Sequence, residues 1–341
     1  MVFIPLNSLI DPLQIPEDGV IFAWEISREH PQELKPDQVD SALSDPDKSV
    51  WLHLNLSNAR VQRWIRQTPH LPETLKEAIL DEVNRSRMET IDEFGDGLMM
   101  VMNDFRVGLS GTEGDDETGT LWAIMTPHLM LSLRAHPLRT TDTLRHLLRH
   151  HRVNPIDVVS LYHEMIEERA NYLRHRIDRL SADMDGLEES LLTGAQVPEH
   201  ETLGRLRITC GRLRRHYTPE LTALRRLMRH RPAWFSEIDT DKLREQIELL
   251  SYLVDELSNL HERAKMLQDE LSAHMAEFNA KNLQVLSVMT VIFLPMTLVT
   301  GVMGMNMADL PGLEQSFWVV MVAMIGAGLA VFIGLRLRRV I

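Results

Sequence analysis

Two segments near the C-terminal end of the chain contain no ionisable side chain. They are LQVLSVMTVIFLPMTLVTGVMGM over 283–305 and FWVVMVAMIGAGLAVFIGL over 317–335. Each is close to the roughly 20 residues that a helix needs to cross the hydrocarbon core of a bilayer. We therefore expect a transmembrane domain over 282–341, with two membrane helices in contact with lipid and joined by the loop 306–316.

The charges that flank these two segments predict their orientation. The joining loop has no Lys or Arg, whereas Lys281 precedes the first segment and Arg336, Arg338 and Arg339 follow the second. Because basic residues are retained on the cytoplasmic side of a membrane, both termini are expected in the cytoplasm and the loop outside. The sequence thus predicts a multi-pass protein of the cell inner membrane.

A long helix is predicted before the first apolar segment. Its N-cap is expected at Asp239 or Thr240, and no strong helix breaker follows before Pro295. Apolar residues along it alternate spacings of four and three, which is the 3.5-residue repeat of helices packed lengthwise. At 1.5 Å per residue, a helix over 240–305 would span roughly 100 Å. Such a stalk is typical of a membrane protein that projects into the cytoplasm.

The first part of the chain mixes strand and helix signals, and the chain as a whole is expected to be of the α+β class. Strand-like runs bounded by Pro, Gly and Asp occupy 20–27, 50–57, 97–107, 120–126 and 129–135. Helical patterns occupy 59–67, 73–82, 155–192 and 198–230. We expect a cytoplasmic α/β domain over 1–153 and a helical hairpin with its stalk helix over 154–281.

The charge balance restricts the partners of the soluble part. The chain has 36 Lys and Arg against 49 Asp and Glu. Residues 282–341 sum to +1, so residues 1–281 carry −14 against a total of −13. An acidic surface disfavours nucleic acid and favours cations as partners. No nucleophile motif, phosphate-binding loop or complete metal-ligand motif is evident, so we expect neither an enzyme nor a bound cofactor.

Two clusters outside the membrane segments each allow two interpretations. Nine arginines between Arg205 and Arg231 either form a nucleic-acid patch or, as we favour, pair with acidic helices around 167–189 or 239–256. His163 and Glu167 lie four residues apart on a predicted helix. They either form a cytoplasmic metal-sensing site, since imidazole and carboxylate suit zinc, or are ordinary surface residues.

One face of the first apolar segment carries small, hydroxyl and leucine side chains. At helical spacing this face consists of Gly304, Gly301, Thr297, Leu294, Thr290, Leu286 and Leu283. Two helices cannot enclose an aqueous path, so conduction would require several copies around an axis, most simply as a cyclic ring. The face is either the lining of such a pore or a surface that lets helices approach closely.

The residues at the outer end of this segment resemble a known family. Gly304-Met305-Asn306, the preceding FLPMTLVTG over 293–301, the short outward loop and the acidic domain with its stalk resemble the CorA metal-ion transporters over the whole chain. Met303, the loop MADLPG over 307–312 and VWLHLNLSN over 50–58 are similar to the ZntB-type zinc transporter branch. The intact Gly-Met-Asn differs from many members of that branch, and the alternative is a magnesium channel.

The resemblance implies a funnel-shaped homopentamer in which the first membrane helix of each subunit lines a pore and the second packs outside it. It implies that Asn306, in the signature Gly304-Met305-Asn306, forms a ring that meets the incoming hydrated cation. Farther in, the implied pore-lining positions are Thr297 and Leu294, and the implied hydrophobic constriction is Leu286 and Leu283. These positions coincide with the face that helical spacing predicts.

The expected activity is transport of divalent cations, most simply zinc uptake, with Mg2+, Co2+, Ni2+ and Cd2+ as alternative cargo. Carboxamides can contact the waters of a hydrated dication without removing them. No His or Cys follows His274, so the pore has no ligand that selects zinc by direct bonds. Asp309 and Glu314 are the only acids on the outer side and are the candidates for concentrating cations there or for carrying protons. A two-helix membrane receptor with a cytoplasmic partner-binding domain is the alternative from another class.

Overall fold

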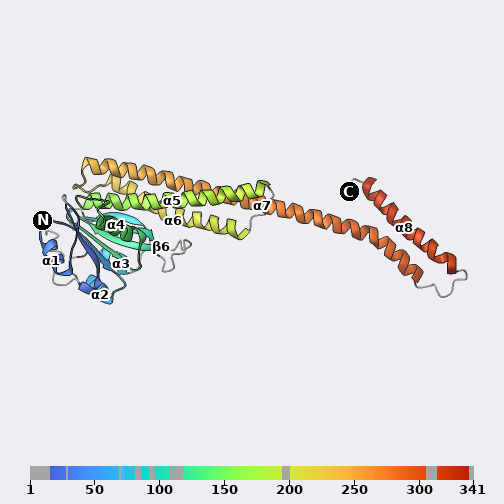
Figure 1. Cartoon of the computed structure of the whole chain (residues 1–341), viewed down its shortest axis with the longest axis horizontal. Coiled ribbons are helices and arrows are strands. Elements are labelled where there is room, and N and C mark those ends of the chain that lie inside the picture. Colours follow the sequence, from blue (N-terminus) through green and yellow to red (C-terminus); the bar gives the residue numbers. More distant parts are fainter. Residues whose placement is uncertain are drawn as a thin grey trace. The chain divides into compact units, whose positions relative to one another are not determined.

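The computed structural model describes residues 16–27, 30–68, 71, 73–80, 86–91, 97–107, 118–193, 200–304 and 313–337. The chain divides into two compact units, Met1–Met266 and Leu267–Ile341. The first unit contains a β-sheet and several helices, and the second consists of helix (Figure 1).

Within the described residues, the strands of the first unit form one seven-stranded sheet in the order β2-β1-β3-β7-β6-β5-β4. The strands are β1 Val20–Ile26, β2 Gln32–Glu33, β3 Ser49–Asn55, β4 Arg87–Ile91, β5 Gly97–Phe105, β6 Thr118–Met125 and β7 Leu129–Arg134. The central strands β3 and β7 pair in parallel, and the other neighbours are antiparallel. Every residue of β7 is buried, so both faces of the sheet are covered.

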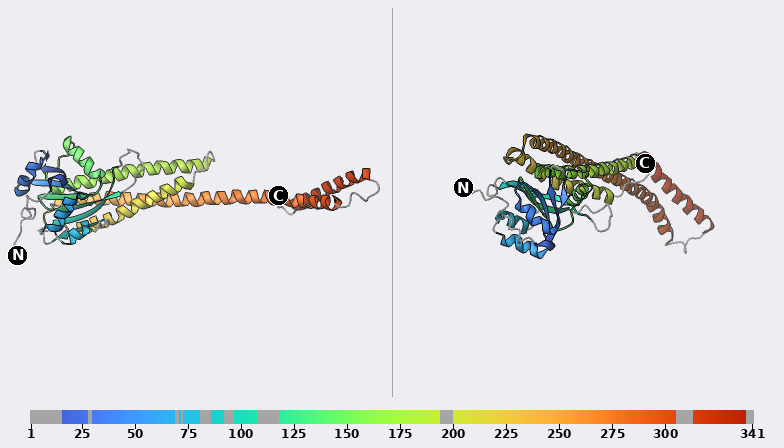
Figure 2. Two further views of the ribbon diagram at one scale, coloured as in Figure 1. Left: turned by 90° about the horizontal axis from the view of Figure 1, so that it is seen from below. Right: turned by 60° about the vertical axis from the view of Figure 1, so that its left-hand side comes forward.

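Helices cover the two faces of the sheet (Figures 1 and 2). The helices of the first unit are α1 Pro36–Ser44, α2 Ala59–Gln67, α3 Glu73–Leu80, α4 Arg139–Arg149, α5 Val158–Thr193 and α6 His200–Arg229, together with the first part of α7 Glu237–Gly304. A hydrophobic core joins α1, α2 and α3 to one face of the sheet. The long helices α5 and α6 lie along the other face, where α6 contacts β4 and β5.

The structure confirms the strands predicted over 20–27, 50–57, 97–107, 120–126 and 129–135 and the α+β class. The helices predicted over 59–67, 73–82, 155–192 and 198–230 are also present, within a few residues at each end. The prediction missed β2 and β4 and the helices α1 and α4. Helix α1 begins with Pro36, and proline is preferred at the first position of a helix, so a start signal was available.

The N-cap of helix α7 lies three residues before Asp239, the first of the two predicted N-cap positions. The Oγ of Ser236 accepts a hydrogen bond from the N–H of Asp239 at 3.2 Å, and Oδ2 of Asp239 accepts one from the N–H of Ser236 at 2.9 Å. This reciprocal pair is a capping box in which Asp takes the place of Glu. Ser236 is therefore the N-cap, and the prediction of Asp239 or Thr240 was wrong because it overlooked this earlier serine.

The apolar residues that recur along α7 at alternating spacings of four and three form a seam. Other parts of the chain cover this seam along only part of its length. Seam positions from Leu243 to Leu271 are buried or half-buried. Beyond them Met275 and Phe278 are 48% and 65% exposed. The helix has 68 residues and continues without interruption through Pro295, so it is about 100 Å long.

A buried ion pair joins α5 and α6 behind the sheet. Nη2 of Arg169 donates to Oε2 of Glu220 at 2.5 Å and to the carbonyl of Asn103 in β5 at 2.6 Å. Nearby, Asp104 accepts from the N–H and the hydroxyl of Thr140 in the first turn of α4, both at 2.9 Å. Burial raises the pKa of the Glu220 carboxyl, an effect that the charge of Arg169 opposes. These bonds fix both long helices on the sheet.

We expect Arg169→Met to lower the free energy of unfolding by about 3–5 kcal/mol, because it leaves the carboxyl of Glu220 buried without its partner. The double variant Arg169→Met/Glu220→Leu should recover most of this loss. Arg215→Met, at an exposed position of α6, should change the stability by less than about 0.5 kcal/mol. Thermal unfolding of the purified full chain in detergent measures all three, and equal losses for Arg169→Met and Arg215→Met would contradict the prediction.

Candidate functional site

The second unit holds the apolar end of α7 and the helix α8, Leu313–Leu337. Among the described residues, α7 is the one helix long and apolar enough to cross a membrane, with a mean hydropathy of 2.0 in a window of which nothing is buried. Helix α8 adds a shorter apolar run, Met321–Leu337. Both segments that lack ionisable side chains therefore fold as helix.

Helix α8 packs against one face of α7. A methyl group placed on Gly328 would lie 2.0 Å from Cε of Met296, so the glycine lets the two helices approach closely. The half-buried residues of α7 in this region are Val288, Ile292, Pro295, Met296 and Val299. At 3.6 residues per turn these side chains share one face, the face from which Met296 reaches Gly328.

The predicted pore face lies on the opposite side of α7. Its described members Leu283, Leu286, Thr290, Leu294, Thr297 and Gly301 are all exposed. Leu283, Leu286 and Leu294 are 64%, 62% and 66% exposed. Because successive residues turn by about 100° around a helix, this set and the half-buried set are centred about half a turn apart. Helix α8 thus leaves the predicted face uncovered.

Two threonines present oxygen lone pairs on this uncovered face. The hydroxyl of Thr290 donates to the carbonyl of Leu286 at 2.8 Å, and that of Thr297 donates to the carbonyl of Phe293 at 2.8 Å. Since each hydroxyl proton is engaged within the helix, the oxygen remains an acceptor for the hydrogens of water or for a cation. The face therefore offers neutral oxygen ligands between leucines.

The other predicted residues of the outer end lie at or beyond the limit of the described residues. Gly304 is the last residue of α7. Met305, Asn306 and Asp309 lie outside the described residues. Glu314 belongs to the first turn of α8, and its side chain is outside the described part of the chain.

The geometry pairs His163 with α7 and not with Glu167. The ring is 3% exposed, with Nδ1 2.9 Å from Oε1 of Gln246 and Nε2 3.8 Å from Oδ1 of Asp239. Glu167 is exposed. Burial lowers the pKa of His163, so the ring is neutral at neutral pH. The described residues contain no group of three or more His, Cys, Asp and Glu that could hold a metal ion.

Among the described ion pairs, the predicted pairing of the arginines of 205–231 with the acidic helices is confirmed in part, by Arg231 with Glu237 at the start of α7. Arg205 lies 4.0 Å from Glu201 of its own helix, and Arg231 lies 2.7 Å from Glu237. The acids of α5 at positions 185 and 188 instead pair with Arg263 of α7. The leucines of α6 at 203, 213 and 224 are buried, whereas Arg205 and Arg215 are exposed.

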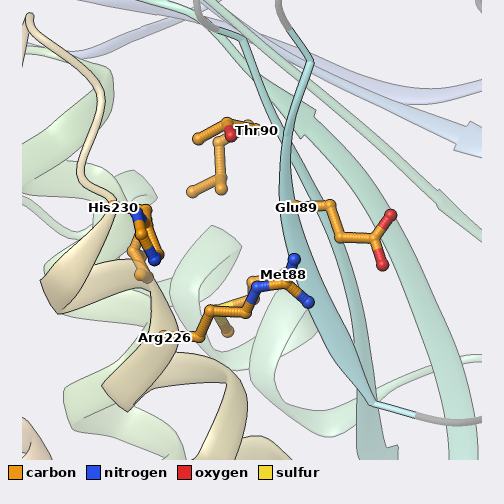
Figure 3. Close-up of a pocket in the computed structure, with 7 residues that line it drawn as sticks. Met88, Glu89, Thr90, Arg226 and His230 are labelled. Atoms are coloured by element: carbon orange, nitrogen blue, oxygen red, sulfur yellow. The ribbon is translucent and has the colours of Figure 1, made fainter.

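A pocket of about 340 Å³ lies between β4 and the end of α6 (Figure 3). Arg226 and His230 extend from α6 toward Met88 and Thr90 on β4, whereas the carboxylate of Glu89 points away from them (Figure 3). The groups that face one another across the pocket are therefore basic or neutral. This arrangement gives no ligand set for a divalent cation.

An α+β domain continued by a long helix with an exposed apolar face is an architecture typical of a membrane protein. The chain belongs to the CorA-like Mg2+ transporter protein family, whose sequence model matches residues 46–339. It is therefore a divalent cation transporter, and its family is one of transporters and not of enzymes.

Relatives of known name agree with this membership. The zinc transport protein ZntB of Klebsiella pneumoniae is 29% identical over 300 residues, which cover 88% of this chain and 88% of the relative. The structure of full-length CmaX covers 96% of this chain and 99% of its own, with a TM-score of 0.78 and 24% identity. The structure of the CorA magnesium transporter from Methanocaldococcus jannaschii covers 93% of this chain and 98% of its own, with a TM-score of 0.73 and 18% identity. At these identities the two structures show that the fold is shared.

Gly328→Leu should separate α8 from α7, because the added side chain occupies the place of Met296. We expect a loss of about 1–3 kcal/mol in stability, measured as a lower temperature of thermal unfolding in detergent. Gly326→Leu is the matched control, since a Cβ at Gly326 would meet no atom within 4 Å. Equal losses in the two variants would show that the contact between Gly328 and Met296 does not hold α8 in place.

Proposed function

We propose that this chain takes up zinc across the inner membrane as a homopentamer. The observation that carries the proposal is the face of α7 opposite α8, which is uncovered and bears two threonine hydroxyls. One copy cannot enclose a path for ions, so five copies place this face around a common axis and α8 toward lipid. The α/β domain over 1–153 and the helices over 154–281 form the cytoplasmic funnel, and both termini are cytoplasmic.

The proposed path begins at the signature Gly304-Met305-Asn306. A ring of Asn306 carboxamides contacts the waters of a hydrated dication, which avoids the cost of removing them. The oxygens of Thr297 and Thr290 then offer weak, exchangeable contacts, as flux requires. Leu286 and Leu283 form a hydrophobic constriction that closes by excluding water. Leu294 and Gly301 complete the lining.

The choice of zinc is supported by the name of the Klebsiella pneumoniae relative, which is a zinc transport protein, and by the loop MADLPG over 307–312. Apolar and hydroxyl side chains do not select zinc by direct bonds, so Cd2+, Ni2+ and Co2+ should also pass. Magnesium is the second candidate. The intact Gly-Met-Asn signature and the family's description as Mg2+ transporters favour it.

Asn306→Ala should reduce zinc uptake into liposomes by at least about tenfold while leaving assembly unchanged, because the proposed first contact of the hydrated ion is lost. Asn282→Ala, which lies on α7 outside the proposed face, is the control. Size-exclusion chromatography reports assembly. Uptake should be compared for zinc, cadmium, nickel, cobalt and magnesium.

Two results of that comparison would contradict parts of the proposal. Strong magnesium flux without zinc flux would replace zinc by magnesium as the cargo. Assembled protein that carries none of the five cations, with or without Asn306, would instead support a membrane receptor.

We also propose that a proton gradient drives uptake. The segments 283–305 and 317–335 contain no titratable side chain, so the proton carriers are sought in Asp309 and Glu314 at the outer mouth. The double variant Asp309→Asn/Glu314→Gln should lose the stimulation of zinc uptake by a pH gradient while keeping uptake without a gradient. Unchanged stimulation would remove these two acids as carriers.

A further inference from the structure

The beginnings of α5 and α7 are joined at His163. Nδ1 of its ring lies 2.9 Å from Oε1 of Gln246, and Nε2 of the same amide donates to the carbonyl of His163 at 2.9 Å. A carbonyl oxygen can accept a hydrogen bond only from the nitrogen of the Gln246 side chain, so the oxygen of that side chain faces the ring. A carboxamide oxygen can only accept a hydrogen bond. The proton of the neutral ring therefore resides on Nδ1 of His163. Nε2 then carries a lone pair.

This lone pair has no hydrogen-bond partner among the described residues, although Nε2 is fully buried. The nearest charged atom is Oδ1 of Asp239, at 3.8 Å. The other oxygen of Asp239 accepts from the N–H and the hydroxyl of Ser236 at 2.9 and 2.5 Å, within the capping box of α7. At this distance Nε2 and the carboxylate make no hydrogen bond, so the neutral ring is held by Gln246, and a proton on Nε2 places a buried charge beside the cap of α7.

Three charged groups act on the ring from the two helices. Burial has the largest effect and lowers the pKa of His163. Asp239 of α7 and Asp157, the residue before α5, raise this pKa, whereas Lys242 of α7 lowers it. The net pKa is lowered, so the folded chain favours the neutral ring, and acidification places a charge in a buried junction.

We propose that His163, Gln246 and Asp239 form a proton-responsive junction that holds the beginning of α7 against α5 and loosens when the cytoplasm becomes acidic. Protonation places a poorly solvated charge on the ring, 3.8 Å from Asp239, and that charge competes with Ser236 for the carboxylate that caps the first turn of α7. Helix α7 is continuous from this turn to Gly304, so the junction acts on the helix that lines the proposed pore. The effect on transport rests on the proposed function, but proton binding at His163 does not.

The direction of the stability effect follows from the lowered pKa. The unfolded chain binds the proton near the ordinary pKa of about 6.5, and the folded chain binds it only at lower pH. The contribution of the junction is therefore fully present above pH ~6.5 and is lost as the pH falls from there toward the folded pKa. His163→Gln should remove this part of the acid destabilisation.

An NMR titration of the full chain in detergent, labelled at the histidine Cε1 carbons, tests proton binding. The signal of His163 is assigned by its loss in His163→Gln and should titrate below pH ~6.5. Asp239→Asn removes the facing charge while keeping a side chain that can cap the helix, and it should lower the midpoint further. His274→Gln, at an exposed site on α7, should leave the midpoint unchanged. A titration midpoint of His163 at or above pH ~6.5, or one that does not change in Asp239→Asn, would contradict the proposed proton-responsive junction.

Cation uptake into liposomes tests regulation. With the outer-side pH held constant, lowering the cytoplasmic-side pH from about 7.5 to 5.5 should change uptake by about twofold or more in the native chain and in His274→Gln, and by less in His163→Gln. Equal pH dependence in all three would overturn the regulatory role, whatever the titration shows. No uptake by any variant, beside the expected titration, would instead count against the proposed function and confine the junction to a stability effect.

Discussion

The exposed apolar surface of α7 beyond Leu271 has to be covered by something other than its own chain. Up to that residue the seam is buried or half-buried, whereas Phe278, Leu283 and Leu286 are each more than 60% exposed. Soluble proteins rarely expose a continuous apolar surface of this length, because its burial is the main driving force of folding and association. Helix α8 covers one face only. The remaining surface requires lipid, further copies of the chain, or both.

The same helix must be held firmly where it meets water. The first unit achieves this with the contact of Gln246 of α7 with His163 of α5, while the buried pair of Arg169 with Glu220 joins α5 to α6. Arg263 of α7 adds a bond to the acids of α5 at positions 185 and 188. Buried polar pairs give little net stability but strongly penalise alternative alignments, since a shifted partner leaves a group unpaired. They therefore suit a helix whose packing has to be unique.

Local sequence patterns sufficed for the long helices, most strands and the two apolar segments. The residues that share the uncovered face of α7 were also predictable, because Thr290, Thr297 and the leucines around them recur at helical spacing, whereas their place in a pore stays a prediction. Contacts between elements that are distant in the sequence could not be predicted from local patterns. The candidate site of His163 with Glu167 rested on their spacing in one helix, whereas the neighbours of His163 in the structure, Asp239 and Gln246, come from another helix. The partners of the arginines of 205–231 were predicted only in part, since charge counting does not tell which face of a helix packs.

Two different roles for protons follow from where titratable groups lie. A proton that drives uptake must cross the membrane with the cation, yet the segments 283–305 and 317–335 have no group to carry it. It must then pass through water in the pore or bind at its ends. In the proposed topology a proton that binds His163 stays on the cytoplasmic side, so it supplies no energy and can change only the rate at which transport proceeds. A pH effect on the final accumulation of cation therefore requires a crossing proton, whereas an effect on the rate alone points to the junction of α5 and α7.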